Sequence, residues 1–136
     1  MSTIVTDAGF NIEDPIPAFT SLAQLPFHEG AIDLANTDDP TALTAYLADL
    51  RLIRIDFPSF ADGRGFTVAR RLRMIGFKGR LRARGHVLAD QYAMARRVGF
   101  DEVEISDALA ARQPVDQWLA RADWQAHDHQ HRLRAG

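Results

Sequence analysis

Two short stretches of this 136-residue chain carry the side chains best suited to chemistry. The first is the loop at residues 56–65, DFPSFADGRG, which offers the carboxylates of Asp56 and Asp62. The second contains Arg82 and Arg84, which are two residues apart and are followed by glycine. Carboxylates serve as general acids and bases, and guanidinium groups bind oxyanions through paired hydrogen bonds. These stretches therefore predict an anion-binding site, an active site, or both.

The first stretch is expected at the end of one strand and the second at the end of the next, and ligands of α/β proteins bind at the carboxyl ends of parallel strands. We expect Arg64, Arg82 and Arg84 to converge on one anion. Asp56 and Asp62 are the candidate catalytic residues, as acid, base or orienting group. The alternative is that these aspartates only pair with the arginines and hold the loops. The glycine–arginine–glycine run is too short to predict a phosphate-binding loop.

Further residues of these stretches, and a few others, are expected to shape the loops rather than to react. Asp90 and Gln91 lie on or beside the apolar arc of an expected helix, where a polar side chain needs partners. Hydrogen bonds to a neighbouring loop explain them better than catalysis does. The loop-shaping residues are Phe57, Pro58, Phe60, Gly63, Gly65, Arg73, Gly85, Asp90 and Gln91.

Histidine and cysteine give no clear catalytic or metal-binding pattern. His127, His129 and His131 are spaced at every second position, and side chains two apart on a helix point about 200° away from each other. Only an extended segment would present them together, so no metal site is predicted. His28 and His86 have no recognisable triad partner. The absence of cysteine excludes disulfides, thiolate nucleophiles and iron–sulfur clusters ligated by this chain.

Charge is unevenly distributed, although the formal net charge is only −2. Residues 1–50 hold eight acidic and no basic side chains, whereas residues 51–97 hold twelve basic and three acidic ones. Fifteen of the sixteen basic residues are arginine, which favours an oxyanion or an acidic partner. The alternatives are the codon preference of a GC-rich genome and an acidic arm folded onto the cationic block. The negative total and the lack of a recognition motif argue against nucleic acid.

The sequence contains no apolar run near the roughly 18 residues that a membrane-spanning helix needs. The first thirty residues have no Lys or Arg, whereas a signal peptide begins with a positive region. We therefore expect no membrane association and a cytoplasmic location.

Strands and helices that alternate along the chain are expected to position these residues. We expect one α/β domain over residues 31–124 and a polar tail over residues 125–136. Residues 1–30 are expected to form an acidic arm, extended or irregular, with one short strand near Ile4 and Val5. Such alternation predicts a parallel sheet of about four strands joined by helices. The expected strands lie at residues 31–34, 52–57, 80–84 and 102–105, and the expected helices at 40–50, 65–76, 86–98 and 115–122.

Apolar and charged residues alternate within these strands, as where Ile53 and Ile55 flank Arg54. Strands buried on both faces usually read as continuous apolar runs instead. The pattern favours a sheet with helices mainly on one face, like half of a β/α barrel. A small doubly wound open sheet is the alternative. The polar face would have to meet water, a ligand or a partner.

Several motifs resemble one bacterial family. They are F-P-x-F-x-D-G-R-G-F at 57–66, A-x-x-L-R at 69–73, G-F-x-G at 76–79, L-R-A-x-G-x-V-L-x-D-Q at 81–91 and G-F-D at 99–101. Over about residues 30–105 the chain resembles domain-of-unknown-function family 934, DUF934. It departs from the family pattern at Thr67, where serine is expected, and at Arg80, where glutamate is expected.

Proteins of this family are labelled probable oxidoreductases and are encoded beside the sulfite reductase haemoprotein in assimilatory sulfur operons. The resemblance implies an accessory role in sulfite reduction, as a partner, assembly factor or electron-transfer factor of that haemoprotein. One alternative is a small oxidoreductase-type enzyme with an arginine-lined anion site. Another is a structural module that forms a homodimer through the polar sheet face. The sequence has no dinucleotide fingerprint, and no residue identifies a cofactor.

Overall fold

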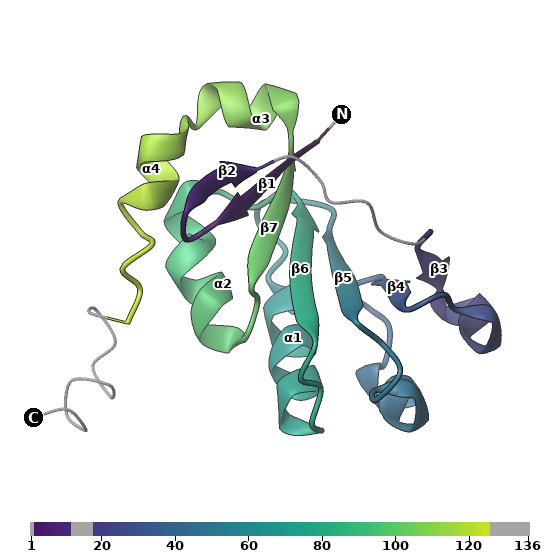
Figure 1. The fold of residues 1–136 in the computed structure, drawn as a ribbon. Helices are drawn as coiled ribbons and strands as arrows, with labels where there is room; N and C mark the ends of the chain where they lie inside the picture. Colours follow the sequence, from purple (N-terminus) through teal and green to yellow (C-terminus); the bar gives the residue numbers. More distant parts are fainter. Residues whose placement is uncertain (1, 12–17, 126–136) are drawn as a thin grey trace, which may run out of the picture.

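The fold was obtained as a computed structural model, which describes residues 2–11 and 18–125. Figure 1 shows the strands side by side in one open sheet with helices packed against it. The strands are β1 (Ser2–Thr6), β2 (Gly9–Asn11), β3 (Thr20–Ser21), β4 (Ala31–Leu34), β5 (Leu52–Phe57), β6 (Arg80–Gly85) and β7 (Glu102–Ser106). The helices are η1 (Leu22–Phe27), η2 (Pro40–Tyr46), α1 (Arg64–Met74), η3 (Ala89–Gln91), α2 (Tyr92–Val98), α3 (Asp107–Arg112) and α4 (Val115–Leu119), where η marks a 3₁₀ helix.

The sheet has seven strands in the order β2-β1-β7-β6-β5-β4-β3. Strands β3 to β7 are parallel and lie in the order of the sequence, whereas β1 runs antiparallel to β7 and to β2. The four expected strands are present as β4 to β7, and the α/β prediction is confirmed. The sheet is nevertheless larger than the expected four strands.

The additional strands come from the segment that the sequence predicts as an acidic arm. Residues 2–11 form a hairpin whose first strand extends the sheet beside β7. Ile4 and Val5 are almost fully buried there, and their burial stabilises a strand too short to show a clear pattern in the sequence. At the other edge, the two-residue strand β3 pairs with β4.

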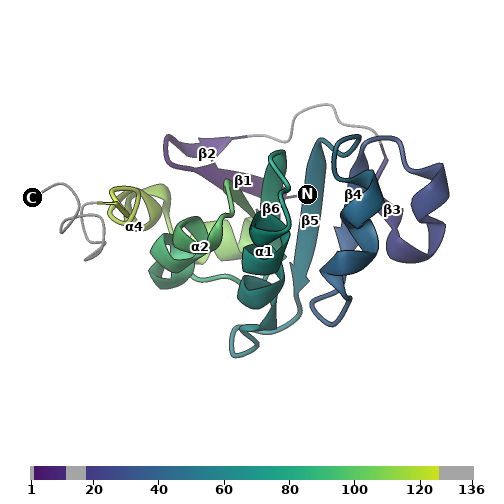
Figure 2. The same cartoon turned by 90° about the horizontal axis from the view of Figure 1, so that it is seen from below.

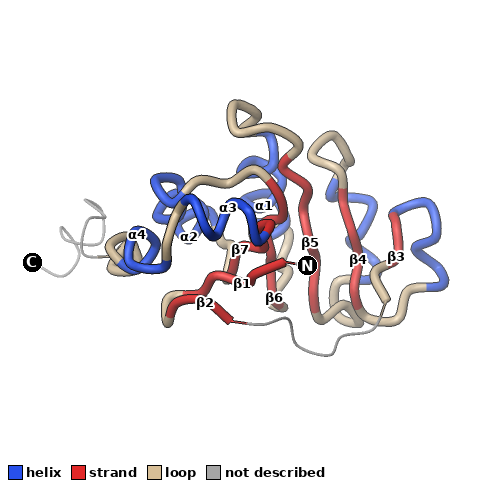
Figure 3. Tube along the Cα trace, turned by 90° about the horizontal axis from the view of Figure 1, so that it is seen from above, coloured by secondary structure: helices blue, strands red, loops and turns tan. Residues whose placement is uncertain are grey.

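The helices α1 and α2 lie on one side of the row of strands, as the views along the sheet show (Figures 2 and 3). From α1, Phe66, Val68, Ala69 and Leu72 are buried in the core beneath the apolar face of the sheet. No helix within residues 2–11 and 18–125 is long and apolar enough to cross a membrane.

Two of the expected helices differ from the prediction. The segment after β4 forms the short 3₁₀ helix η2, which Asp39 caps by accepting a hydrogen bond from the Thr41 amide at 3.0 Å. The last expected helix, at 115–122, is present as the shorter α4, and an additional helix, α3, precedes it. The chain is extended at Pro114, which separates the two.

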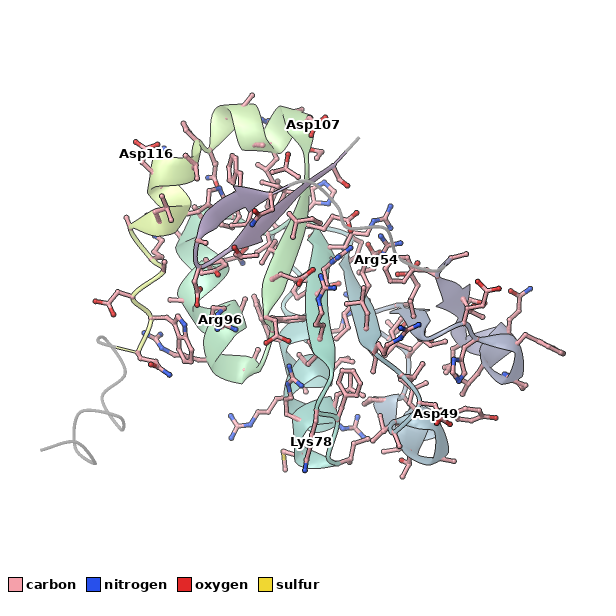
Figure 4. All side chains as sticks on the ribbon, in the orientation of Figure 1. Asp49, Arg54, Lys78, Arg96, Asp107 and Asp116 are labelled. Atoms are coloured by element: carbon pink, nitrogen blue, oxygen red, sulfur yellow. The ribbon has the colours of Figure 1, made fainter. Side chains whose placement is uncertain are left out.

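The hairpin of β1 and β2 is fastened to α2 through its turn. The Tyr92 hydroxyl donates to Asp7 in that turn, and Arg96 forms an ion pair with the same carboxylate at 3.1 Å. Figure 4 labels Arg96 beside the hairpin. Burial, together with the hydrogen bond to Asp7, raises the pKa of Tyr92 well above its ordinary value. The hydroxyl therefore remains a donor throughout the neutral range.

Candidate functional site

Charged side chains on the polar face of the sheet form a continuous row of ion pairs. Arg54 lies in front of the sheet in Figure 4, with Nε 2.6 Å from Asp33 and Nη1 3.0 Å from Glu104. On the next strand, Arg82 places Nε 2.6 Å from Glu102 and Nη1 3.0 Å from Glu104. We call Asp33, Arg54, Glu104, Arg82 and Glu102 the ion-pair row. It crosses β4, β5, β6 and β7.

The ion-pair row neutralises charged side chains on the polar face of the sheet. Register places opposite charges beside each other, Asp33 beside Arg54 and Arg82 beside Glu102, so these side chains are paired within the chain. Arg82 is fully buried, and Glu102 and Glu104 are each only 5% exposed. Burial raises the pKa of Glu104, but Arg54 and Arg82 lower it more, so the net shift is downward.

The three arginines expected to share one anion are instead held by different carboxylates. Arg64 pairs with Asp62 at 2.7 Å, and Arg82 belongs to the ion-pair row. Arg84 lies at the end of β6, with Nε 3.7 Å from Glu104. The structure therefore does not bring the three guanidinium groups together around one position.

Asp62 fastens the loop between β5 and α1. It accepts a hydrogen bond from Asn36 at 2.8 Å, and it also binds the side chain and amide of Arg64. These hydrogen bonds, above all that from the Arg64 side chain, hold the pKa of Asp62 well below its usual range. A carboxylate so firmly ionised is suited to anchoring a loop and poorly suited to exchanging protons near neutral pH.

An open cavity of about 470 Å³ lies at the carboxyl ends of β5, β6 and β7. We call it the edge cavity. Its polar lining comes from four segments of the chain, because the start of β1 reaches the same end of the sheet as the ends of β5, β6 and β7. Those residues are Ser2, Asp56, Arg84, His86, Glu104 and Ser106.

Of the two catalytic candidates, only Asp56 lines the edge cavity. Its carboxylate makes no hydrogen bond or ion pair with any residue that the structure describes. Arg84, whose side chain is half exposed, is the one predicted anion-binding arginine in the lining. The cavity therefore combines an available carboxylate with an available guanidinium.

His86 also lines the edge cavity, although its sequence context gave it no partner. Its Nδ1 lies 3.2 Å from the carbonyl oxygen of Phe57. The Phe60 ring packs edge-on against the imidazole, with 4.9 Å between the ring centroids. Because a carbonyl only accepts hydrogen bonds, Nδ1 carries the proton in the neutral ring and Nε2 is an acceptor. The one sequence signal for His86 is its position immediately after β6.

Two glycines allow the loops to approach closely at this end of the sheet. A Cβ on Gly65 would lie 2.5 Å from the Phe57 ring, so the first turn of α1 packs this closely on Phe57 because the residue is glycine. Gly85 has φ of 114°, and its Cβ would lie 2.7 Å from the Phe57 carbonyl oxygen. Both glycines therefore allow the neighbouring backbone to approach Phe57 closely.

The other loop residues connect neighbouring segments. Gln91 accepts a hydrogen bond from the Leu88 amide at 2.9 Å and donates to the Phe60 carbonyl at 3.4 Å. Asp90 forms an ion pair with Arg121. Pro58 lines the edge cavity, and Gly63 is the N-cap residue that precedes α1.

Arg73 joins three segments at the opposite end of the sheet. Its guanidinium donates to the carbonyl oxygens of Phe77, Gly79 and Gly99, and to the carboxylate of Asp101 at 2.9 Å. These bonds connect the end of α1 with the turns before β6 and β7. The motifs at 69–73, 76–79 and 99–101 therefore meet at Arg73, and we call this set of hydrogen bonds the clamp.

The surface of α1 and α2 has a different character from the edge cavity. These two helices contain six arginines and no acidic residue. Arg70 and Arg97 are exposed and make no ion pair with a described residue, and Met74 and Met94 are 76% and 51% exposed. We call these four residues the outer helix face. Sequence reasoning identified the cationic block but not which arginines remain available.

Most of the cationic block is neutralised within the chain. Eight of the twelve basic residues over 51–97 form ion pairs, mainly with carboxylates outside that range. Asp7 belongs to the expected acidic arm and pairs with Arg96, as the folded-arm alternative predicts.

The predicted histidine series at His127, His129 and His131 lies outside the described residues. Among residues 2–11 and 18–125, no three or more histidine or acidic side chains are grouped as metal ligands.

Comparison with known proteins was made for families, curated proteins and solved structures. The searches of curated proteins and of solved structures found no match. The model of the family described as "Bacterial protein of unknown function (DUF934)" matches residues 31–134, which includes the strands β4 to β7 and all the helices after β4. The chain therefore belongs to the bacterial DUF934 family.

Proposed function

We propose that the chain is an accessory protein of assimilatory sulfite reduction that binds the sulfite reductase haemoprotein as a partner, assembly factor or electron-transfer factor. The family resemblance implies this haemoprotein as the partner. The observation that carries the proposal is the outer helix face, where Arg70 and Arg97 have no carboxylate partner among the described residues.

The composition of the outer helix face favours a protein partner of acidic character. Exposed arginines beside adaptable methionine side chains are typical of protein interfaces, where both residue types are enriched. Met74 lies one helical turn after Arg70, and Met94 lies three residues before Arg97, so each cation has an apolar neighbour. An acidic patch on the haemoprotein would supply the carboxylates that α1 and α2 lack.

We also propose that the sheet has the architecture of half a β/α barrel and that the protein is cytoplasmic. The sequential order of β3 to β7 supports this, since same-handed crossovers keep the helices on one face. A partner on the outer helix face would then leave the edge cavity open. Homodimerisation through the polar face has less support, because the ion-pair row already neutralises its charges within one chain.

An oxidoreductase-type enzyme is the second candidate, and the edge cavity is the observation that favours it. The grouping of Asp56, Arg84 and His86 differs from the predicted anion site, since Arg84 is its one arginine. Asp56 and His86 would then be the groups able to exchange a proton.

The test is binding of the purified chain to purified haemoprotein, measured by native mass spectrometry and by titration. We expect a stoichiometric complex that weakens with salt. Arg70→Glu and Arg97→Glu should each weaken it about tenfold, because each places a negative charge opposite the acidic patch. Arg112→Glu, an equal charge reversal on α3, should have little effect. Absence of a complex, or equal effects of all three variants, would overturn the proposal.

A further inference from the structure

Asp56 and Arg84 lie side by side in the sheet but do not neutralise each other. They are register partners on β5 and β6, on strands about 4.8 Å apart. Their charged groups nevertheless form no ion pair, and Arg84 is directed toward Glu104 on its other side. We propose that the edge cavity binds a free α-amino acid, with its ammonium group on Asp56 and its carboxylate on Arg84. The proposal is independent of docking on the outer helix face.

Arg84 is available to a carboxylate because its protein neighbour is already occupied. Glu104 receives Arg54 and Arg82 at 3.0 Å each, whereas Nε of Arg84 lies 3.7 Å away, beyond hydrogen-bond distance. The Arg84 side chain is half exposed, so its guanidinium retains donors for another group. A planar guanidinium matches a carboxylate through two parallel hydrogen bonds.

Asp56 supplies the complementary charge. It lines the cavity, and within the described part of the chain no cation or hydrogen-bond donor engages its carboxylate. Gly85 leaves one side of this carboxylate uncovered, since a Cβ there would lie in van der Waals contact with Oδ1 of Asp56, at 3.7 Å. An ammonium group would bind the free carboxylate through charge-assisted hydrogen bonds.

The balance of charge in the lining selects a zwitterion over an oxyanion. Two carboxylates, Asp56 and Glu104, face the cavity together with one arginine. Sulfite or phosphate on Arg84 would lie close to both carboxylates, whereas an amino acid presents a positive group to Asp56. Nε2 of His86 remains an acceptor that could bind a polar side chain of the ligand. The volume of about 470 Å³ lies in the range typical of small-molecule sites.

Saturation-transfer NMR of the full chain with the proteinogenic L-amino acids tests this assignment, followed by titration of the strongest binder. Acetate, ethylammonium, sulfite and phosphate serve as comparison ligands, since each carries either negative or positive charge but not both. We expect at least one amino acid to bind more tightly than all four. Asp56→Asn and Arg84→Gln should each reduce its affinity about tenfold, the effect of losing one charge-assisted contact.

Matched controls come from the amino end of β5. Asp49→Asn and Arg51→Gln remove equivalent charges there, and Figure 4 shows Asp49 at the end of the sheet opposite Asp107, the first residue of α3. Both should bind the amino acid as the wild type does, and all four variants should retain the wild-type melting temperature. The proposal is overturned if no amino acid binds, or if sulfite or phosphate binds more tightly and Asp56→Asn strengthens that binding.

Discussion

Nε of Arg82 lies 2.6 Å from a carboxylate oxygen of Glu102, and both residues are buried in the sheet. A buried guanidinium so closely paired belongs to the structure and not to an exchangeable ligand site. The next arginine on the same face, Arg84, is half exposed and more loosely paired. Arg82 and Arg84 are chemically identical and lie on the same face of β6, but Arg82 stabilises the fold and Arg84 is available to a ligand.

The first prediction contrasts these two arginines. Arg82→Ala should lower the free energy of unfolding by about 3 kcal/mol, because it removes the buried guanidinium that Glu102 and Glu104 share, and Arg80 and Arg54 compensate these carboxylates only in part. Arg84→Ala should cost less than about 1 kcal/mol, since its pair is partly exposed and long. Urea unfolding followed by circular dichroism measures both. Equal losses in the two variants would contradict the assignment of Arg82 to the ion-pair row.

A second prediction concerns acid. The folded pKa of Glu104 lies below the ordinary value of 4.5, so its contribution to stability is present above pH 4.5. That contribution is lost as the pH falls through the folded pKa. Glu104→Gln should therefore be less stable than the wild type at neutral pH, and the difference should shrink below pH 4.5. Urea titrations at several pH values measure it. A difference independent of pH would show that ionised Glu104 is not what stabilises the row.

The clamp at the amino end of the sheet gives a third prediction. Arg73→Ala should lower the free energy of unfolding by about 3 kcal/mol, since it removes the side-chain donor to three carbonyl groups and one of the partners of Asp101. Arg70→Ala, three residues earlier on α1, should change it by no more than about 0.5 kcal/mol. Chemical unfolding of the two variants side by side tests this. A similar loss in both would indicate that helix propensity, and not the clamp, explains the effect.

The turn after β6 supplies a fourth prediction. Gly85 and Gly76 both have positive φ, but a Cβ on Gly85 would meet the Phe57 carbonyl at 2.7 Å, whereas one on Gly76 would meet nothing within 4 Å. Gly76→Ala should therefore cost about 1 kcal/mol from backbone strain alone. Gly85→Ala should cost at least about 1 kcal/mol more. Thermal melting compares them, and equal costs would rule out the close approach to Phe57.

Much of the parallel part of the sheet could be predicted from the sequence. The strands β4 to β7 alternate apolar and charged residues over four or more positions, which is enough to reveal their period. The hairpin at residues 2–11 could not be predicted with the same clarity, because its burial depends on contact with β7 about a hundred residues away. Ile4 and Val5 alone give no period.

The candidate site was harder to predict than the strands. The pattern places Arg82 and Arg84 on one face but does not reveal register, which sets Arg82 opposite Glu102 and Arg84 opposite Glu104. It also gives no sign that Ser2 and His86 reach one cavity, since only the antiparallel contact of β1 with β7 brings the first strand there. Charge composition located the cationic block, whereas the available cations depended on tertiary pairing.

The most direct test of the docking proposal uses the two exposed methionines of the outer helix face. The chain, labelled with ¹³C at its methionine methyl groups, would be titrated with unlabelled sulfite reductase haemoprotein and followed by NMR. We predict that the resonances of Met74 and Met94 shift or broaden at stoichiometric haemoprotein, and that added salt reverses the change. Formation of a complex with both resonances unchanged, or no complex at all, would contradict docking through this face.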